Sequence, residues 1–139
     1  MRIRPFQADD ERALVALWVA CELTRPWNDP RRDIARKLAD SGELLLIGEE
    51  EGSLVATVMA GYDGHRGWIN YLGVHPSWRG RGLGRALMEA AEERLRALGC
   101  AKINLQIRDD NGEALAFYEA IGYTREPVVS YGKRLVSDE

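Results

Sequence analysis

The segment Arg79-Gly80-Arg81-Gly82-Leu83-Gly84 is the most informative stretch of the sequence. It follows an apolar run that ends at Val74 and opens a helical pattern that begins near Leu83. Glycine permits unusual backbone dihedrals and lets N–H groups approach a ligand closely. The start of a helix adds unpaired N–H donors and the positive end of the helix dipole. The segment therefore predicts a pyrophosphate-binding turn, in which Arg79 and Arg81 supply positive charge.

A glycine-rich turn before a helix is also compatible with a plain strand-to-helix connection whose arginines are solvated, because short motifs match by chance. Two other phosphate-binding motifs do not fit. A dinucleotide fingerprint needs Gly or Ala five positions after its first Gly, where this chain has Arg85 or Leu87. A P-loop needs Gly-Lys followed by Ser or Thr, and the sequence has no such tripeptide. The pattern that remains is R-x-x-G-x-G.

The composition predicts one globular domain over residues 1–139, with a core that needs no disulfide or metal. A formal net charge of -3 argues against a nucleic-acid partner. No apolar run approaches the roughly 20 residues of a membrane-spanning helix, and the N-terminus has no signal-peptide region. We expect a cytoplasmic protein without a membrane partner or a metal site, in which Cys21 and Cys100 are reduced.

Hydrophobic periodicity and turn residues predict a mixed α/β fold class with the order β-α-α-β-β-β-α-β-α-β. Pro127 blurs the division of the last strand region. The expected strands cover residues 2–6, 43–50, 54–62, 68–74 and 101–107, the expected helices cover residues 9–22, 28–38, 83–98 and 111–121, and a last strand or pair of strands lies within 123–136.

A second motif, Asn111-x-x-Ala114-x-x-Phe117-Tyr118-x-x-x-Gly122-Tyr123, follows about thirty residues after the glycine-rich turn. Together with Leu72-Gly73-Val74-His75-Pro76 and R-x-x-G-x-G, it resembles the GNAT family of acetyl-CoA-dependent N-acetyltransferases, and the resemblance covers nearly the whole chain. The segments 23–30 and 61–67 look like those of the YpeA-type bacterial acetyltransferases. The resemblance implies the GNAT fold, whose mostly antiparallel sheet is splayed between the fourth and fifth strands.

The resemblance also implies a site for acetyl-CoA between the splayed strands. A β-bulge is expected around residues 71–74, where a backbone N–H would polarise the thioester carbonyl. Asn111 would bond the cofactor arm, although an Asn at a helix start is also a plain cap. The remaining cofactor residues implied are Leu72, Gly73 and Val74, whose strand would bond pantetheine, and Arg79, Gly80, Arg81, Gly82, Leu83 and Gly84, whose amides would bind the pyrophosphate.

Tyr118 matches the general acid of the family, which protonates the departing thiolate. A phenol titrates near pH 10 and therefore remains a proton donor at neutral pH. The alternative interpretation is a half-buried helix aromatic whose hydroxyl finds a partner. Because neither Cys21 nor Cys100 lies in the motifs, direct transfer is expected rather than an acetyl-cysteine intermediate.

No general base is evident in the sequence. The segments 68–72 and 102–107 contain no carboxylate, and Gln106 stands where the ribosomal-protein alanine acetyltransferases carry Glu. A water relayed through Asn70 or Gln106 is one alternative. Asp63 and His65, in the turn before the fourth strand, are another, although ordinary turn chemistry is the simpler explanation for both residues.

Substrate recognition is expected in the connection between the first two helices, which helps roof the acceptor cleft in GNAT folds. Arg25, Trp27 and Asp29 are the candidate residues there. The alternative is a rigid connector in which Asp29 caps the second helix and Trp27 anchors the segment in the core.

The expected function is that of an acyltransferase that moves an acetyl group from acetyl-CoA directly to a primary amine of a small molecule, peptide or protein. Dimers are common among relatives, so a homodimer is a possible assembly. A catalytically weak acyl-CoA-binding sensor or regulatory module is the alternative, which the missing base favours and Tyr118 opposes. The predicted strand order opposes a nucleotide-binding protein of Rossmann type.

Overall fold

The computed structural model describes residues 1–139 and contains one five-stranded sheet in the order β1-β2-β3-β4-β5. Neighbouring strands are antiparallel except β4 and β5, which are parallel. The elements are β1 (Arg2–Pro5), α1 (Glu11–Ala20), α2 (Pro30–Ser41), β2 (Leu45–Glu50), β3 (Ser53–Tyr62), β4 (Gly67–Val74), α3 (Leu83–Ala97), β5 (Ile103–Leu105) and α4 (Gly112–Ala120). No helix is both long and apolar enough to cross a membrane.

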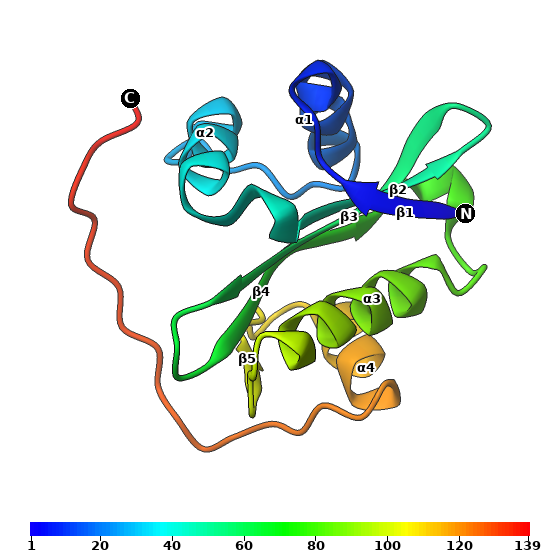
Figure 1. The fold of residues 1–139 in the computed structure, drawn as a ribbon. Helices are drawn as coiled ribbons and strands as arrows, with labels where there is room; N and C mark the ends of the chain where they lie inside the picture. Colours follow the sequence, from blue (N-terminus) through cyan, green and yellow to red (C-terminus); the bar gives the residue numbers. More distant parts are fainter.

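The helices cover both faces of the sheet, α1 and α2 on one side and α3 and α4 on the other (Figure 1). Alternation along β2 directs Ile47 to the core under α1 and α2, and Leu46 to the core over α3. In α3, Leu87, Ala91 and Leu95 recur every four residues and are fully buried against the sheet. The sheet therefore separates two hydrophobic cores.

The predicted fold class and the element order are confirmed as far as α4. The strand predicted within residues 123–136 is wrong, because the chain from Tyr123 to Glu139 contains no helix or strand. Pro127 cannot donate to a backbone ladder, and Val128 and Val129 are 78% and 81% exposed instead of packed on a neighbouring strand.

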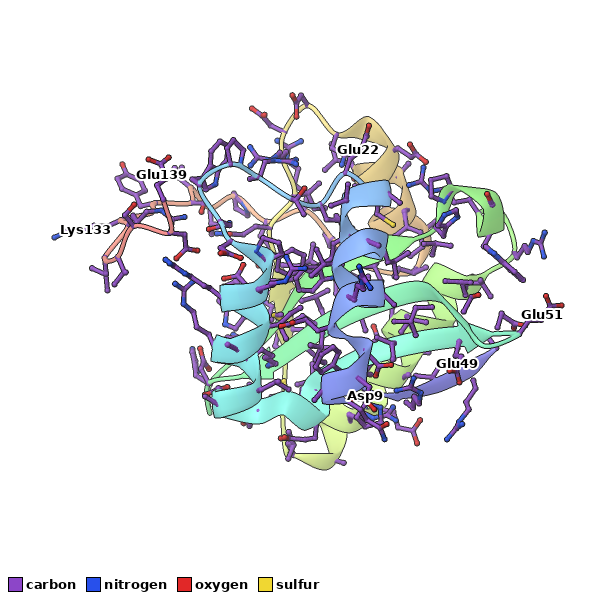
Figure 2. The ribbon with its side chains drawn as sticks, turned by 90° about the horizontal axis from the view of Figure 1, so that it is seen from above. Asp9, Glu22, Glu49, Glu51, Lys133 and Glu139 are labelled. Carbon is purple, nitrogen blue, oxygen red and sulfur yellow. The ribbon has the colours of Figure 1, made fainter.

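This C-terminal tail, residues 123–139, runs beside β5 and then turns toward α2 (Figure 1). Side chains hold it in place: Lys102 pairs with Glu126, and Gln106 donates to Ser130. At the far end, Asp138 pairs with Arg32 and Arg36 of α2, whereas the Lys133 side chain points away from the molecule (Figure 2).

Candidate active site

β4 leaves the regular sheet ladder in the middle of its length. One β3 residue, Val58, lies opposite two β4 residues, Tyr71 and Leu72. Tyr71 has a φ of 52°, in the left-handed region that non-glycine residues rarely adopt. The β-bulge expected around residues 71–74 is therefore present and is centred on Tyr71 and Leu72.

β4 and β5 separate next to this bulge. Their pairing covers only Gly67–Ile69 on β4 and Ile103–Leu105 on β5. From Asn70 to Val74, β4 consequently has no strand on its β5 side. Backbone amide and carbonyl groups need hydrogen-bond partners, so this edge is suited to an extended ligand that carries amide groups.

Gly73 lets β4 lie directly against the end of α1. A Cβ at this position would be 2.9 Å from Cδ1 of Leu23 and 3.1 Å from Cβ and Sγ of Cys21. Any side chain would therefore push β4 and this part of the chain apart. Burial raises the pKa of the Cys21 thiol, which keeps the sulfur protonated.

The glycine-rich turn has the backbone that the sequence predicts. Gly80 and Gly82 have φ values of 78° and 77°, and nothing lies within 4 Å of a Cβ built at either position. Gly82 is the N-cap of α3, so no side chain caps this helix. The N–H groups of the first turn of α3 are therefore available to an anion.

The two arginines of the turn are exposed but anchored. The Nε of Arg79 donates a hydrogen bond of 3.1 Å to the carbonyl of Val74. The guanidinium of Arg81 lies 4.6 Å from the centre of the Trp78 ring. Both positive charges are consequently held beside the N-terminus of α3.

α4 packs against this turn through Phe117. A Cβ on Gly84 would be 3.4 Å from the Phe117 ring and 3.6 Å from Cγ2 of Val74. The three motifs that were separate in the sequence therefore meet at one place. Asn111 caps α4 by accepting a hydrogen bond of 3.0 Å from the N–H of Ala114, so its capping role is confirmed.

Tyr118 is half-buried between two other aromatic rings. The ring centres of Phe117 and Tyr123 are 5.2 Å and 5.8 Å away, both in edge-to-face contact. Burial raises the pKa of Tyr118 to about 12. The hydroxyl of Tyr123 donates to Glu92 at 2.7 Å, whereas that of Tyr118 has no hydrogen-bond partner in the protein. Tyr118 is therefore a protonated phenol with a free O–H.

Comparison with known proteins decides the family. The model of the acetyltransferase (GNAT) family matches residues 12–123. The chain belongs to the GNAT family. An acetyltransferase of Yersinia pestis (strain Pestoides F) is 48% identical over 139 residues, which is all of this chain and 99% of that protein. The protein is accordingly an acetyltransferase.

Solved structures agree with this GNAT fold. The aminoglycoside 6'-N-acetyltransferase AAC(6')-IG from Acinetobacter haemolyticus superimposes with a TM-score of 0.80 at 19% identity, covering 98% of this chain and all of that one. AAC(6')-Iy, solved with a bisubstrate analogue built on CoA, gives 0.78 at 20% identity, covering 96% and 97%. A GCN5-related N-acetyltransferase from Ralstonia eutropha JMP134 gives 0.72 at 27% identity, covering 95% and 97%.

In this GNAT protein, two of the three candidate residues in the connection between α1 and α2 form hydrogen bonds within that segment or cap α2. Arg25 donates 2.9 Å hydrogen bonds to the carbonyls of Glu22 and Thr24. Asp29 caps α2 by accepting from the N–H of Arg31 at 2.9 Å. Both residues therefore shape the connector, and the Asp29 cap is the one that the alternative interpretation predicts. The other part of that interpretation is wrong, because Trp27 is exposed and does not anchor the segment in the core.

Trp27 and Asn70 remain open to solvent. Trp27 is 45% exposed, and the guanidinium of Arg108, in the loop after β5, lies 5.8 Å from its ring centre. The connection between α1 and α2 is thus joined to the loop after β5. Asn70 is exposed at the point where β4 and β5 separate.

Asp63 and His65 lie in the turn at the other end of β4, away from the glycine-rich turn (Figure 1). Asp63 accepts hydrogen bonds from the N–H groups of Arg66 (2.6 Å) and His65 (2.8 Å) and from Nε1 of Trp68 (3.2 Å). These hydrogen bonds lower the pKa of its carboxyl. Asp63 therefore stabilises the turn, and neither Asp63 nor His65 lies at the connection between α1 and α2.

Sequence reasoning missed one polar pair. The hydroxyl of Tyr71, at the bulge, donates to Oδ2 of Asp33 on α2 at 2.5 Å. Thirty-eight residues separate the two in sequence, and no motif links them. No three His, Cys, Asp or Glu side chains gather as a metal site.

Proposed function

We propose that this GNAT enzyme transfers the acetyl group of acetyl-CoA directly to a primary amine. The observation that carries the proposal is the meeting of the splayed β4 edge, the glycine-rich turn and α4 beside one another. Each of the three offers a group that acetyl-CoA and its reaction need: unpaired backbone, anion-binding N–H donors and a phenol.

Binding of acetyl-CoA would use mainly backbone groups of this chain. The β4 edge from Asn70 to Val74 would hydrogen-bond the pantetheine amides, and the first turn of α3 would bind the pyrophosphate. Arg79 and Arg81 would add charge-assisted contacts. The space around Gly80 and Gly82 supports this assignment, because side chains there would fill the approach to the helix N-terminus.

Two groups of the protein would act in the transfer. A backbone N–H of the bulge would bind the thioester carbonyl oxygen, on which negative charge develops. Tyr118 would donate its proton to the sulfur that leaves. Its free hydroxyl supports this role, and its raised pKa keeps the phenol protonated at neutral pH, so that the proton is present when the sulfur leaves.

Direct transfer is favoured because neither thiol is placed to act as a nucleophile. Cys21 is buried against Gly73, and its raised pKa disfavours the thiolate. Cys100 lies beyond the end of α3 and contacts the carbonyl of Lys102. The acceptor amine and acetyl-CoA would therefore be bound together.

Tyr118→Phe tests the proposed acid. We expect kcat to fall by about 10²-fold, since the sulfur would leave without a proton, while the Kd for acetyl-CoA stays unchanged. Steady-state release of free CoA and calorimetric titration measure the two quantities. Tyr123→Phe is the matched control, because it removes a phenol of the same cluster that is already bonded to Glu92. Equal kcat in wild type and Tyr118→Phe at saturating substrate would refute the assignment.

A second candidate function, an acyl-CoA sensor, is favoured by one observation: neither β4 nor β5 carries a carboxylate. The two functions are separated by measuring thermal stabilisation by acetyl-CoA and CoA release with amino sugars, amino acid amides, polyamines and peptides. We expect stabilisation together with release for at least one amine. Stabilisation without release for any of them would establish the sensor instead.

A further inference from the structure

Tyr71 links the bulge of β4 to a carboxylate on α2, that of Asp33. The β-bulge decides which face of the sheet the Tyr71 side chain occupies. Ile69 packs in the core over α3, so strict alternation would send Tyr71 to that same core. The extra residue of the bulge reverses this, and Tyr71 packs instead in the core under α1 and α2. The bulge thus delivers the phenol to the face where Asp33 lies.

The Tyr71 ring is held in one orientation. It stacks on Trp18 with a centroid distance of 3.8 Å and an interplanar angle of 6°. Trp18 is fully buried, and its Nε1 donates to Thr57 at 3.2 Å. The hydroxyl of Tyr71 is therefore fixed in position, 2.5 Å from Oδ2 of Asp33.

Asp33 has capacity for another donor. Its other oxygen accepts from Nη1 of Arg36 at 3.1 Å, and its side chain is 22% exposed. A carboxylate has about four lone-pair sites, of which Tyr71 and Arg36 use two. A substrate N–H group can therefore reach this carboxylate without displacing either neighbour.

The charge around Asp33 favours a cation. Arg32 and Arg36 are shared with two further carboxylates, those of Asp29 and Asp138. Within this ion-pair cluster, three carboxylates therefore face two guanidinium groups, which leaves one negative charge without a paired cation. The neighbouring Arg31 pairs with Glu11 and Arg134 donates to Asn28, so neither forms an ion pair with the cluster. An ammonium group would balance the unpaired negative charge.

We propose that Asp33 binds the ammonium group of the acceptor and accepts its proton, and that Tyr71 is the positioning residue that holds Asp33 beside the bulge. This inference rests on the proposed function. The bulge would bind the thioester carbonyl, Tyr118 lies on the α4 side of the sheet and Asp33 lies on the α2 side. The acid and the proton acceptor thus act from opposite faces.

The proposed transfer conserves protons and electrons at each step. Asp33 takes one proton from the ammonium, and the nitrogen lone pair forms a bond to the thioester carbon. The carbon–sulfur bond then breaks, its electron pair goes to sulfur, and Tyr118 protonates that sulfur. The second nitrogen proton returns through solvent to Tyr118, and the proton on Asp33 leaves to solvent. The products are the acetamide, CoA and one released proton.

Asp33→Asn tests this proposal, with Asp40→Asn on the same helix as the charge-matched control. The probes are glucosamine, ethanolamine, glycinamide and L-lysine amide, assayed with acetyl-CoA. We expect Asp33→Asn to lower kcat/KM for the accepted amine by about 10²-fold or more, and Tyr71→Phe, which keeps the stack on Trp18, to lower it by about tenfold. The Kd for acetyl-CoA should stay at the wild-type value in both variants, and Tm should fall only slightly, because a single hydrogen bond is lost or weakened.

Each other result has a distinct meaning. Wild-type kcat/KM in Asp33→Asn refutes the inference and leaves the proposed function intact. The same loss in Asp40→Asn, or an equal loss of acetyl-CoA affinity in Asp33→Asn, also refutes it, because the effect would then be general. No CoA release by the wild-type enzyme with any probe refutes the proposed function and the inference together.

Discussion

The two turns that flank β4 look alike in sequence and differ in what their polar groups do. Each contains a glycine with positive φ and open space at the Cβ position, Gly64 at 91° and Gly82 at 77°. In the turn before β4, Asp63 already accepts two hydrogen bonds from backbone N–H groups of the turn and one from Trp68 at the start of β4. In the turn after β4, the N-terminus of α3 has no side-chain cap. The turn that we propose binds phosphate thus differs from the structural turn in the donors that it leaves unused.

The difference between the two turns is tested most directly by placing the same bulky side chain in both. We expect Gly82→Trp to raise the Kd for acetyl-CoA by more than about 100-fold, a loss of roughly 3 kcal/mol, because the indole would fill the phosphate approach. Gly64→Trp should leave the Kd unchanged. Isothermal titration calorimetry measures both.

Stability serves as the control for this pair. Both substitutions place a side chain at a left-handed φ, so each should lower the free energy of unfolding by a similar amount, about 1–2 kcal/mol. Denaturant unfolding checks this. Equal Kd values for the two variants would show that the turn after β4 is not the phosphate site.

A smaller effect is expected from the arginines. Arg81→Ala should raise the Kd for acetyl-CoA by about tenfold, because one charge-assisted contact to phosphate is lost. Arg66→Ala, in the turn before β4, is the matched control and should have no effect on affinity. Titrations at low and high salt should show that the difference shrinks as salt screens the phosphate charge. An unchanged Kd in Arg81→Ala would show that Arg81 does not contribute to phosphate binding, which would then depend on the backbone N–H groups.

The smallest effect is expected in the structural turn. Asp63→Ala should lower Tm at neutral pH and leave the Kd for acetyl-CoA unchanged, because its three hydrogen bonds serve only the turn and the start of β4. The folded pKa of Asp63 lies below 3.8. Its contribution to stability is therefore present above that pH and is lost as pH falls through the folded pKa.

The pH dependence gives the matching control. Calorimetry at neutral pH and at about pH 3 should show the Tm difference between wild type and Asp63→Ala shrinking in acid. A loss of kcat/KM in Asp63→Ala with unchanged Tm would return this residue to the list of candidate bases.

Features with a local cause could be predicted from the sequence. Gly82 before a helix requires a positive φ, and Asn111 and Asp29 are good caps wherever a helix starts. Helical spacing of apolar residues likewise predicts α3. These features depend on neighbours within one turn of chain, so the sequence alone carries the signal.

Features that depend on tertiary contacts could not be predicted. Alternation along β4 places Tyr71 on the α3 side, and only the bulge moves it to the α2 side, next to Asp33. The tail residues Val128 and Val129 have the composition of a strand, yet they remain outside the sheet. The sequence around Asp63 fits both a candidate base and a turn residue, and only its three hydrogen-bond donors in the folded chain distinguish the two.

The contact between Gly73 and the end of α1 has a consequence for changing what this enzyme acetylates. No side chain separates β4 from Cys21 and Leu23, so the backbone that we propose binds acetyl-CoA rests directly on the start of the connection between α1 and α2. Redesign of that connection for a new amine can therefore begin at Trp27, whose side chain is exposed. Enlarging Cys21 or Leu23 would shift β4 itself, and the choice of acceptor would no longer be adjustable independently of the donor.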